Sequence, residues 1–301
     1  MTKTAISVSL GSSKRDKKTV LNLLGEDVIL ERRGTDGDVD RAAALFKELD
    51  GKVDALGFGG MDLWLHASDD KLYPIRAAHK IVAGVKQTPL VDGHGLKNTL
   101  EARVVDALVE NLGESYRTGR VMLTAAVDRY GMTKAFFASD YEVMCGDMMF
   151  GLGLPIPIRS ERGFRIVARL LVPVASRLPI SILYPTGEKQ EQIVPKFGKW
   201  YNWATVIAGD CHYIKQHMPA DLSGTVIVTN TTTEADMVAF RERGVEYVLT
   251  TTPVLDGRSF GTNMMEAALT AIAGKGRPLN DAELNALLDE LQFKPTMHRL
   301  G

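Results

Sequence analysis

Seven short polar segments of the sequence carry the residue types that bind or transform small molecules. The densest is Asp92-Gly93-His94-Gly95-Leu96-Lys97-Asn98. Asp92 could act as a base, His94 could move a proton and Lys97 could supply a positive charge, while the glycines let backbone approach a ligand closely. We predict these three side chains as catalytic residues. The alternative is a glycine-rich turn whose His and Lys face water.

The second segment, Asp128-Arg129-Tyr130-Gly131, follows the apolar run Val121–Val127. A dinucleotide site needs a tight turn after one strand and an acid about 20 residues further on, and Asp147 stands at that spacing. We therefore predict that Asp128, Arg129 and Gly131 contact a cofactor phosphate and that Asp147 binds a ribose. Only Gly131 stands where the full fingerprint has three glycines, so a turn without a nucleotide is the alternative.

Polar side chains also end three later apolar runs. They are Gly209-Asp210-Cys211-His212, Asn230 with Thr231, and Thr250-Thr251-Thr252. In an open parallel sheet, ligands collect at the carboxyl ends of the strands. We predict that Asn230 and Thr251 contact the cofactor and that Asp210 and His212 contact the substrate. Capping of the following helix is the alternative for Asn230 and Thr231.

Two further segments combine backbone amides, hydroxyls and cations, the groups that bind a phosphate or a carboxylate. One follows the first predicted strand, where a solvated turn is the alternative. The other opens a predicted helix over Met264–Ile272, whose amino end favours negative charge. The predicted anion-binding residues are Ser12, Ser13, Lys14 and Arg15 in the first segment and Arg258, Ser259, Thr262 and Asn263 in the second.

The elements that position these segments alternate between strands and helices. Ala5–Leu10, Asp27–Glu31 and Val53–Phe58 are rich in strand-forming residues, and Val39–Leu49 has helical spacing with an Asp before it. Such alternation predicts the α/β class, with a parallel sheet. A helix is also expected to begin near Lys17, and others over residues 73–84 and 98–112.

The second half of the chain repeats this alternation, which predicts a doubly wound, Rossmann-like sheet followed by a C-terminal helix from Asn280. The turn-rich stretch Gly113–Gly119 predicts the boundary between an N-terminal α/β domain, residues 1–115, and a Rossmann-like domain, residues 116–301. Phe164–Val172 could face a partner or a membrane surface, but a buried helix that caps the sheet is favoured.

Composition excludes several classes of protein. The chain has 301 residues, 45% of them hydrophobic, and 36 basic against 37 acidic residues. The resulting net charge of -1 provides no field that attracts nucleic acid or an anionic membrane. Cys145 and Cys211 lack metal-ligand spacing, and no transmembrane or signal segment is apparent, so we expect a cytoplasmic protein without a metal site. The sequence allows a homo-oligomer but does not determine the oligomeric state.

The chain resembles a bacterial family labelled quinate 5-dehydrogenase at Gly11–Asp16, at Leu183–Gln190, and at Thr250–Pro253 with Gly257–Asn263, and the likeness extends over nearly the whole length. The resemblance implies an NAD(P)-dependent oxidation of a hydroxylated, quinate- or shikimate-like carboxylate, in a cleft between a substrate domain and a Rossmann domain. Related dehydrogenases hold a Lys and an Asp beside the substrate hydroxyl. Lys97 is the nearest candidate for the Lys, and Asp92 or Asp106 for the acid.

Two functions follow from these segments. The favoured one is an NAD(P)-dependent oxidoreductase, with NAD or NADP as its cofactor. The alternative is a non-redox protein, either a sensor or a transferase-like enzyme. In it Ser12, Ser13, Lys14, Arg258 and Thr262 hold a small anionic or phosphorylated metabolite between the domains.

Overall fold

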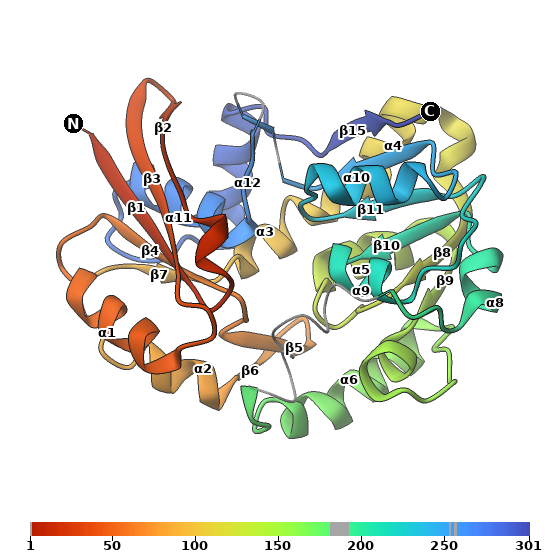
Figure 1. The fold of residues 1–301 in the computed structure, drawn as a ribbon, viewed down its shortest axis with the longest axis horizontal. Helices are drawn as coiled ribbons and strands as arrows, with labels where there is room; N and C mark the ends of the chain where they lie inside the picture. Colours follow the sequence, from red (N-terminus) through yellow and green to blue (C-terminus); the bar gives the residue numbers. More distant parts are fainter. Residues whose placement is uncertain (1, 181–192, 253, 256–257) are drawn as a thin grey trace.

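The computed structural model describes residues 2–180, 193–252, 254–255 and 258–301. They form two α/β units, each built on its own largely parallel sheet, which lie at the left and at the right of Figure 1. The predicted α/β class is thereby confirmed. None of the described helices is long and apolar enough to cross a membrane.

The first sheet contains, in spatial order, β2 (Lys17–Leu23), β3 (Glu26–Gly34), β1 (Lys3–Ser9), β4 (Ala55–Gly59) and β7 (Leu90–Val91). All neighbours are parallel except the edge pair β2 and β3. The chain places β3 on one side of β1 and β4 on the other, so the strand order reverses there. A reversal of this kind opens a crevice beyond the carboxyl ends of the two strands, here β1 and β4.

Helices cover both faces of the first sheet. Helices α1 (Val39–Leu49) and α2 (Arg76–Ile81) pack on one face, around Phe46 and Phe58. The other face carries α3 (His94–Asn98), α11 (Thr262–Ala273) and α12 (Asp281–Glu290). Alternate residues of each strand supply the two cores: Ala5 faces the second set of helices, whereas Ile6 faces the first.

The second sheet contains, in spatial order, β15 (Thr296–Arg299), β12 (Tyr247–Thr250), β11 (Val226–Thr229), β10 (Val206–Gly209), β8 (Thr118–Leu123) and β9 (Asp140–Cys145). Only β15, at the edge, is antiparallel. Here the strand order reverses at β8, between β9 and β10. This is the doubly wound arrangement that the sequence predicts.

Its two faces are also covered by helices. One core contains residues of α4 (Val104–Leu112) and α5 (Tyr130–Phe137). The opposite core contains residues of α8 (Gly198–Trp203), α9 (Cys211–His217) and α10 (Glu234–Arg241). Helix α10 is capped at its amino end, because Thr233 and Asp236 exchange side-chain to backbone hydrogen bonds.

The helix α6 (Glu161–Ala175) connects the two units along the lower side of Figure 1. Its Phe164 packs in the core of the second sheet, whereas Ala168 and Val172 pack in the core of the first, beside the hairpin of β5 (Trp64–Ser68) and β6 (Lys71–Pro74). A helix is therefore present where it was expected, but only one stripe of it is buried, and it covers β5 instead of capping a main sheet. Ile166 and Leu170 on its outer face are exposed.

Some predicted elements differ from the observed ones. Lys17 begins strand β2 and not a helix, because alternate residues such as Leu21 and Leu23 are buried, which is a period of two. The helix expected over residues 73–84 shrinks to α2, since Tyr73 belongs to β6. The helix expected over residues 98–112 begins only at Val104, after a 3-10 turn.

The packing divides the chain differently from the predicted domains, 1–115 and 116–301. Helix α4, placed by the prediction in the first domain, packs on the second sheet. Helices α11 and α12, placed in the second, pack on the first sheet, and β15 then returns to the second. The apolar stripe of each helix is visible in the sequence, but the sheet against which it packs is not.

Candidate functional site

An ion-pair network joins the strand ends of the two sheets. We call it the interdomain network and define it by Asp62, Lys97, Glu101, Asp128, Arg129 and Asp210. Asp62 comes shortly after β4 of the first sheet, and Asp128 and Asp210 come after β8 and β10 of the second. The network therefore connects the two places where the strand order reverses.

Lys97 forms the link between the units. It lies on α3, and its Nζ donates to Asp62 Oδ1 and to Asp128 Oδ1, both at 2.7 Å. Its side chain is only 9% exposed. Burial alone lowers the pKa of a lysine, but the carboxylates of Asp128 and Asp62 outweigh that effect and raise the pKa of Lys97. The lysine is therefore a fixed cation that bridges one carboxyl from each unit.

Arg129 organises the other half of the network. Its Nη1 donates to Glu101 at 2.6 Å, its Nη2 donates to Asp210 at 2.8 Å, and its Nε lies 3.1 Å from Asp128 Oδ2. The guanidinium thus contacts three carboxylates, and two of them, Glu101 and Asp210, accept hydrogen bonds from it. Asn230 also donates to Asp210, at 3.0 Å.

The carboxyls of the network differ in exposure and in proton affinity. Burial raises the pKa of Asp62 well above its usual range, and the nearby Asp128 carboxylate adds to this effect. Burial would also raise the pKa of Asp128, but Lys97 and Arg129 outweigh it and hold the pKa below its usual range. Opposite shifts of this kind are typical of a carboxyl pair that shares one proton.

Only part of the network faces solvent. The side chain of Glu101 is fully buried and that of Arg129 is 4% exposed, whereas the side chains of Asp128 and Asp210 are 24% and 18% exposed. His212, at the start of α9, is exposed beside Asp210, which caps that helix by accepting from the His212 amide. The solvent-accessible groups are thus the carboxylates of Asp128 and Asp210 and the imidazole of His212, whereas the Glu101–Arg129 ion pair is buried.

Of the three predicted catalytic residues, only Lys97 belongs to the network. Asp92 accepts hydrogen bonds from the amides of Leu63 and His94 and so shapes the turn before α3. His94 stacks on His66 with ring centroids 4.4 Å apart. Burial lowers the pKa of His94 to about 4 against the opposing effect of Asp92, so its imidazole is neutral in ordinary buffers.

The residues predicted to bind a cofactor make contacts within the protein. Asp147 accepts from the amide of Val127 at 2.9 Å, and burial raises its pKa to about 6. Thr251 is fully buried and lies 3.4 Å from Glu101. Gly131 lies inside α5, where a Cβ would come within 2.2 Å of the Lys97 carbonyl oxygen. This glycine therefore lets α5 pack on α3.

We expect Gly131→Ala to lower the free energy of unfolding by about 1–3 kcal/mol, because the new methyl group has no space and the obstructing atoms are backbone. Urea denaturation would measure the change. Gly151→Ala is the matched control, since no atom lies within 4 Å of its added methyl. Equal stability of the two variants would contradict this packing role.

The predicted anion-binding residues that the structure places lie near the carboxyl end of β1, the central strand of the first sheet. Lys14 and Arg15 are exposed in a 3-10 turn after β1, where Ser12 accepts from the Lys14 amide. Thr262 and Asn263 begin α11, and Asn263 donates to Ser7 of β1 at 2.5 Å. Ser13 donates its amide to Asp36.

Part of this prediction lies outside the described residues. Arg258 and Ser259 form β14, which pairs with β13 (Val254–Leu255), but their side chains are not among the described ones. Asp256, Gly257 and the segment 183–190 are not described either.

Sequence reasoning missed Asp62, Glu101 and Glu266. Asp62 follows a predicted strand and two glycines, so the same strand-end argument that found Asp210 could have found it. Glu101 lies in a predicted helix and carries no such signal. Burial raises the pKa of Glu266 on α11 to about 8, although its carboxyl accepts from the Leu96 amide. Among the described residues, no His, Cys, Asp and Glu side chains are grouped to hold a metal ion.

Comparison with known proteins identifies family models of both parts of the chain. Residues 95–300 match the model described as "Domain of unknown function (DUF8754)", and residues 4–92 match "Domain of unknown function (DUF8753)". No curated protein matches the chain.

The comparison also found solved structures of low similarity. A glucose-galactose binding protein, GanP from Geobacillus stearothermophilus, is 8% identical, with 100% of this chain and 98% of that chain covered and a TM-score of 0.38. A substrate-binding protein of a sugar ABC transport system from Bordetella parapertussis is 12% identical, with 98% and 82% covered and a TM-score of 0.36. A protein from Mycobacterium smegmatis in complex with β-D-fucofuranose is 10% identical, with 99% and 100% covered and a TM-score of 0.33.

The prediction of an NAD(P)-binding oxidoreductase is wrong. In this chain Arg129, Gly131 and Asp147, the residues on which that prediction depended, are engaged in an ion-pair network, a helix contact and a turn. The spacing of a turn, a glycine and a distant acid was present, but the packing of α5 and the loop after β8 accounts for each of them.

Proposed function

The chain belongs to the DUF8754 family, and we propose that it is a non-redox protein that binds a small polar metabolite between its two α/β units. The ligand contacts the exposed carboxylates of the interdomain network and carries an anionic group toward the loop after β1. This is the alternative that the polar segments of the sequence already allowed.

One observation carries the proposal. The strand order reverses at β1 in the first sheet and at β8 in the second, and in open α/β sheets the carboxyl ends of the strands at such a reversal are the favoured position of a ligand. Lys97 bonds to one carboxyl beside each reversal, Asp62 and Asp128. The two favoured ligand positions of this fold are therefore adjacent and electrostatically coupled.

The accessible groups define the chemistry of the ligand. The partly exposed carboxylates of Asp128 and Asp210 are hydrogen-bond acceptors, which suit hydroxyl or ammonium donors. Lys14 and Arg15 are exposed cations beyond β1, which suit a carboxylate or phosphate. A hydroxylated acid or a sugar phosphate combines both kinds of group.

A thermal-shift screen tests the proposal. The compounds that the proposal predicts as candidates are glucose, glucuronate, glucose 6-phosphate and amino acids. NAD(H) and NADP(H) are included to test the redox interpretation. A metabolite present at 100 times its Kd should stabilise the protein by about 2.7 kcal/mol. Stabilisation by a nicotinamide cofactor alone, or by none of these compounds, would contradict the proposal.

Substitution of the exposed carboxylates tests the location of the site. Asp210→Asn removes a charge but keeps the shape of the side chain, and we expect the best ligand of the screen to bind roughly tenfold more weakly, as for the loss of one charge-assisted hydrogen bond. Calorimetric titration would measure the Kd. Asp140→Asn, an exposed acid at the start of β9, is the control and should leave the Kd unchanged.

A further inference from the structure

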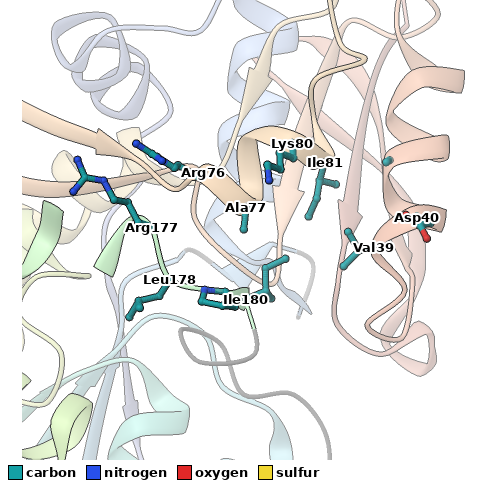
Figure 2. A pocket seen from close by; sticks show the side chains of 11 residues that line it. Val39, Asp40, Arg76, Ala77, Lys80, Ile81, Arg177, Leu178 and Ile180 are labelled. Atoms are coloured by element: carbon teal, nitrogen blue, oxygen red, sulfur yellow. The ribbon is translucent and has the colours of Figure 1, made fainter. Parts of the chain in front are cut away.

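A pocket that shares no lining residue with the interdomain network lies between α1, α2 and the segment that follows α6. Its volume is about 580 Å³, which is within the usual range for small-molecule sites. The two helices belong to the first unit, whereas residues 177–180 continue from α6. Figure 2 shows Arg76 and Arg177 at one end of this pocket and Val39 and Asp40 at the other.

The lining of the pocket is apolar with an excess of positive charge. Its cations are Arg76, Lys80 and Arg177, and its single acid is Asp40. In the described part of the chain, no carboxylate forms an ion pair with any of the three cations. The remaining lining residues are Val39, Ala43, Ala77, Ile81, Leu178, Pro179 and Ile180.

We propose that this pocket is a second binding site, which takes an amphipathic anion. The carboxylate or phosphate head lies between Arg76 and Arg177, because guanidinium groups bind both kinds of anion through paired donors. A short apolar body lies over Ile81 and Leu178, where burial of its methylene groups adds to the affinity.

The pocket lies beside the end of α6, the helix that packs on the second unit through Phe164 and on the first through Val172. The amide of Arg76 donates to the carbonyl of Ser176 at 3.0 Å, so the amino end of α2 is already tied to the end of α6. A ligand that contacts Arg76 and Arg177 together reinforces this connection. The site is thus distinct from that of the metabolite at the interdomain network, with which it shares no residue.

Calorimetric titration of the full chain with octanoate and with octyl phosphate tests the proposal. At least one should bind saturably, and the tighter of the two identifies the head group. 1-Octanol lacks the charge and inorganic phosphate lacks the apolar body, so each should bind roughly tenfold more weakly than the better amphiphile. Equal binding of octanol, equal binding of phosphate, or no saturable binding up to about 10 mM would overturn the proposal.

Three variants localise the binding. Arg76→Gln combined with Arg177→Gln should weaken the better amphiphile roughly tenfold or more, and both side chains are exposed, so the fold is kept. Ala77→Phe fills the pocket without a change of charge and should cause a comparable loss. Arg162→Gln, an exposed cation on the outer side of α6, is the control. An equal loss in this control would show non-specific attraction and contradict the site.

Discussion

Arg129→Ala is expected to lower the free energy of unfolding by about 3–5 kcal/mol, the usual cost of removing one partner of a buried ion pair. Glu101 is fully buried and would be left without its cation, and Asp210 would lose the 2.8 Å contact as well. Equilibrium denaturation in urea measures the change, with CD and fluorescence compared to verify a two-state transition.

Lys294→Ala is the matched control, because Lys294 pairs with Glu110 at 2.8 Å while both side chains stay more than half exposed. Exposed ion pairs contribute little, so this variant should unfold at nearly the wild-type urea concentration. A cost for Arg129→Ala no greater than that of the control would contradict the buried network.

Glu266→Gln is expected to stabilise the protein increasingly as the pH rises from about 4.5 to about 8. Burial raises the pKa of this carboxyl from 4.5 to about 8, so the folded protein retains a proton that the unfolded chain releases. Below both pKa values the folded and unfolded states bind the same number of protons. At a pH between the two pKa values, the wild type loses stability as the pH rises. The full shift corresponds to an upper limit on the order of 4–5 kcal/mol.

Urea denaturation of wild type and variant across the range from about pH 5 to about pH 9 measures this difference. The two curves should diverge up to about pH 8 and then run parallel. Glu290→Gln, an exposed acid on α12, should show no divergence. A Glu266→Gln difference that does not change with pH would show that the carboxyl is not held protonated by the fold.

Much of the fold follows from local signals in the sequence. The helix α1 begins and ends as predicted, because Asp38 caps it and Ala42, Phe46 and Leu49 form one buried stripe. The position of Asp128 and Asp210 directly after apolar runs likewise marked both as candidate site residues, although Asp128 was assigned to a cofactor. These features depend on neighbours within a few residues, which a single sequence shows directly.

The rest of the site depends on long-range packing. Glu101 and Arg129 meet because α5 crosses the turn after α3, and Gly131 is small for the same reason. A glycine that permits a helix contact and a glycine that admits a phosphate are identical in the sequence. The redox interpretation arose from this ambiguity, since only the structure shows which backbone approaches Gly131.

Hydrogen–deuterium exchange with the metabolite that stabilises the protein most in the thermal screen is the most direct test of a shared interdomain site. We expect slower exchange at the strand ends of both units together, in peptides that cover residues 60–62, 124–130 and 209–213. Protection confined to one unit, or located only around α1 and α2, would contradict the account.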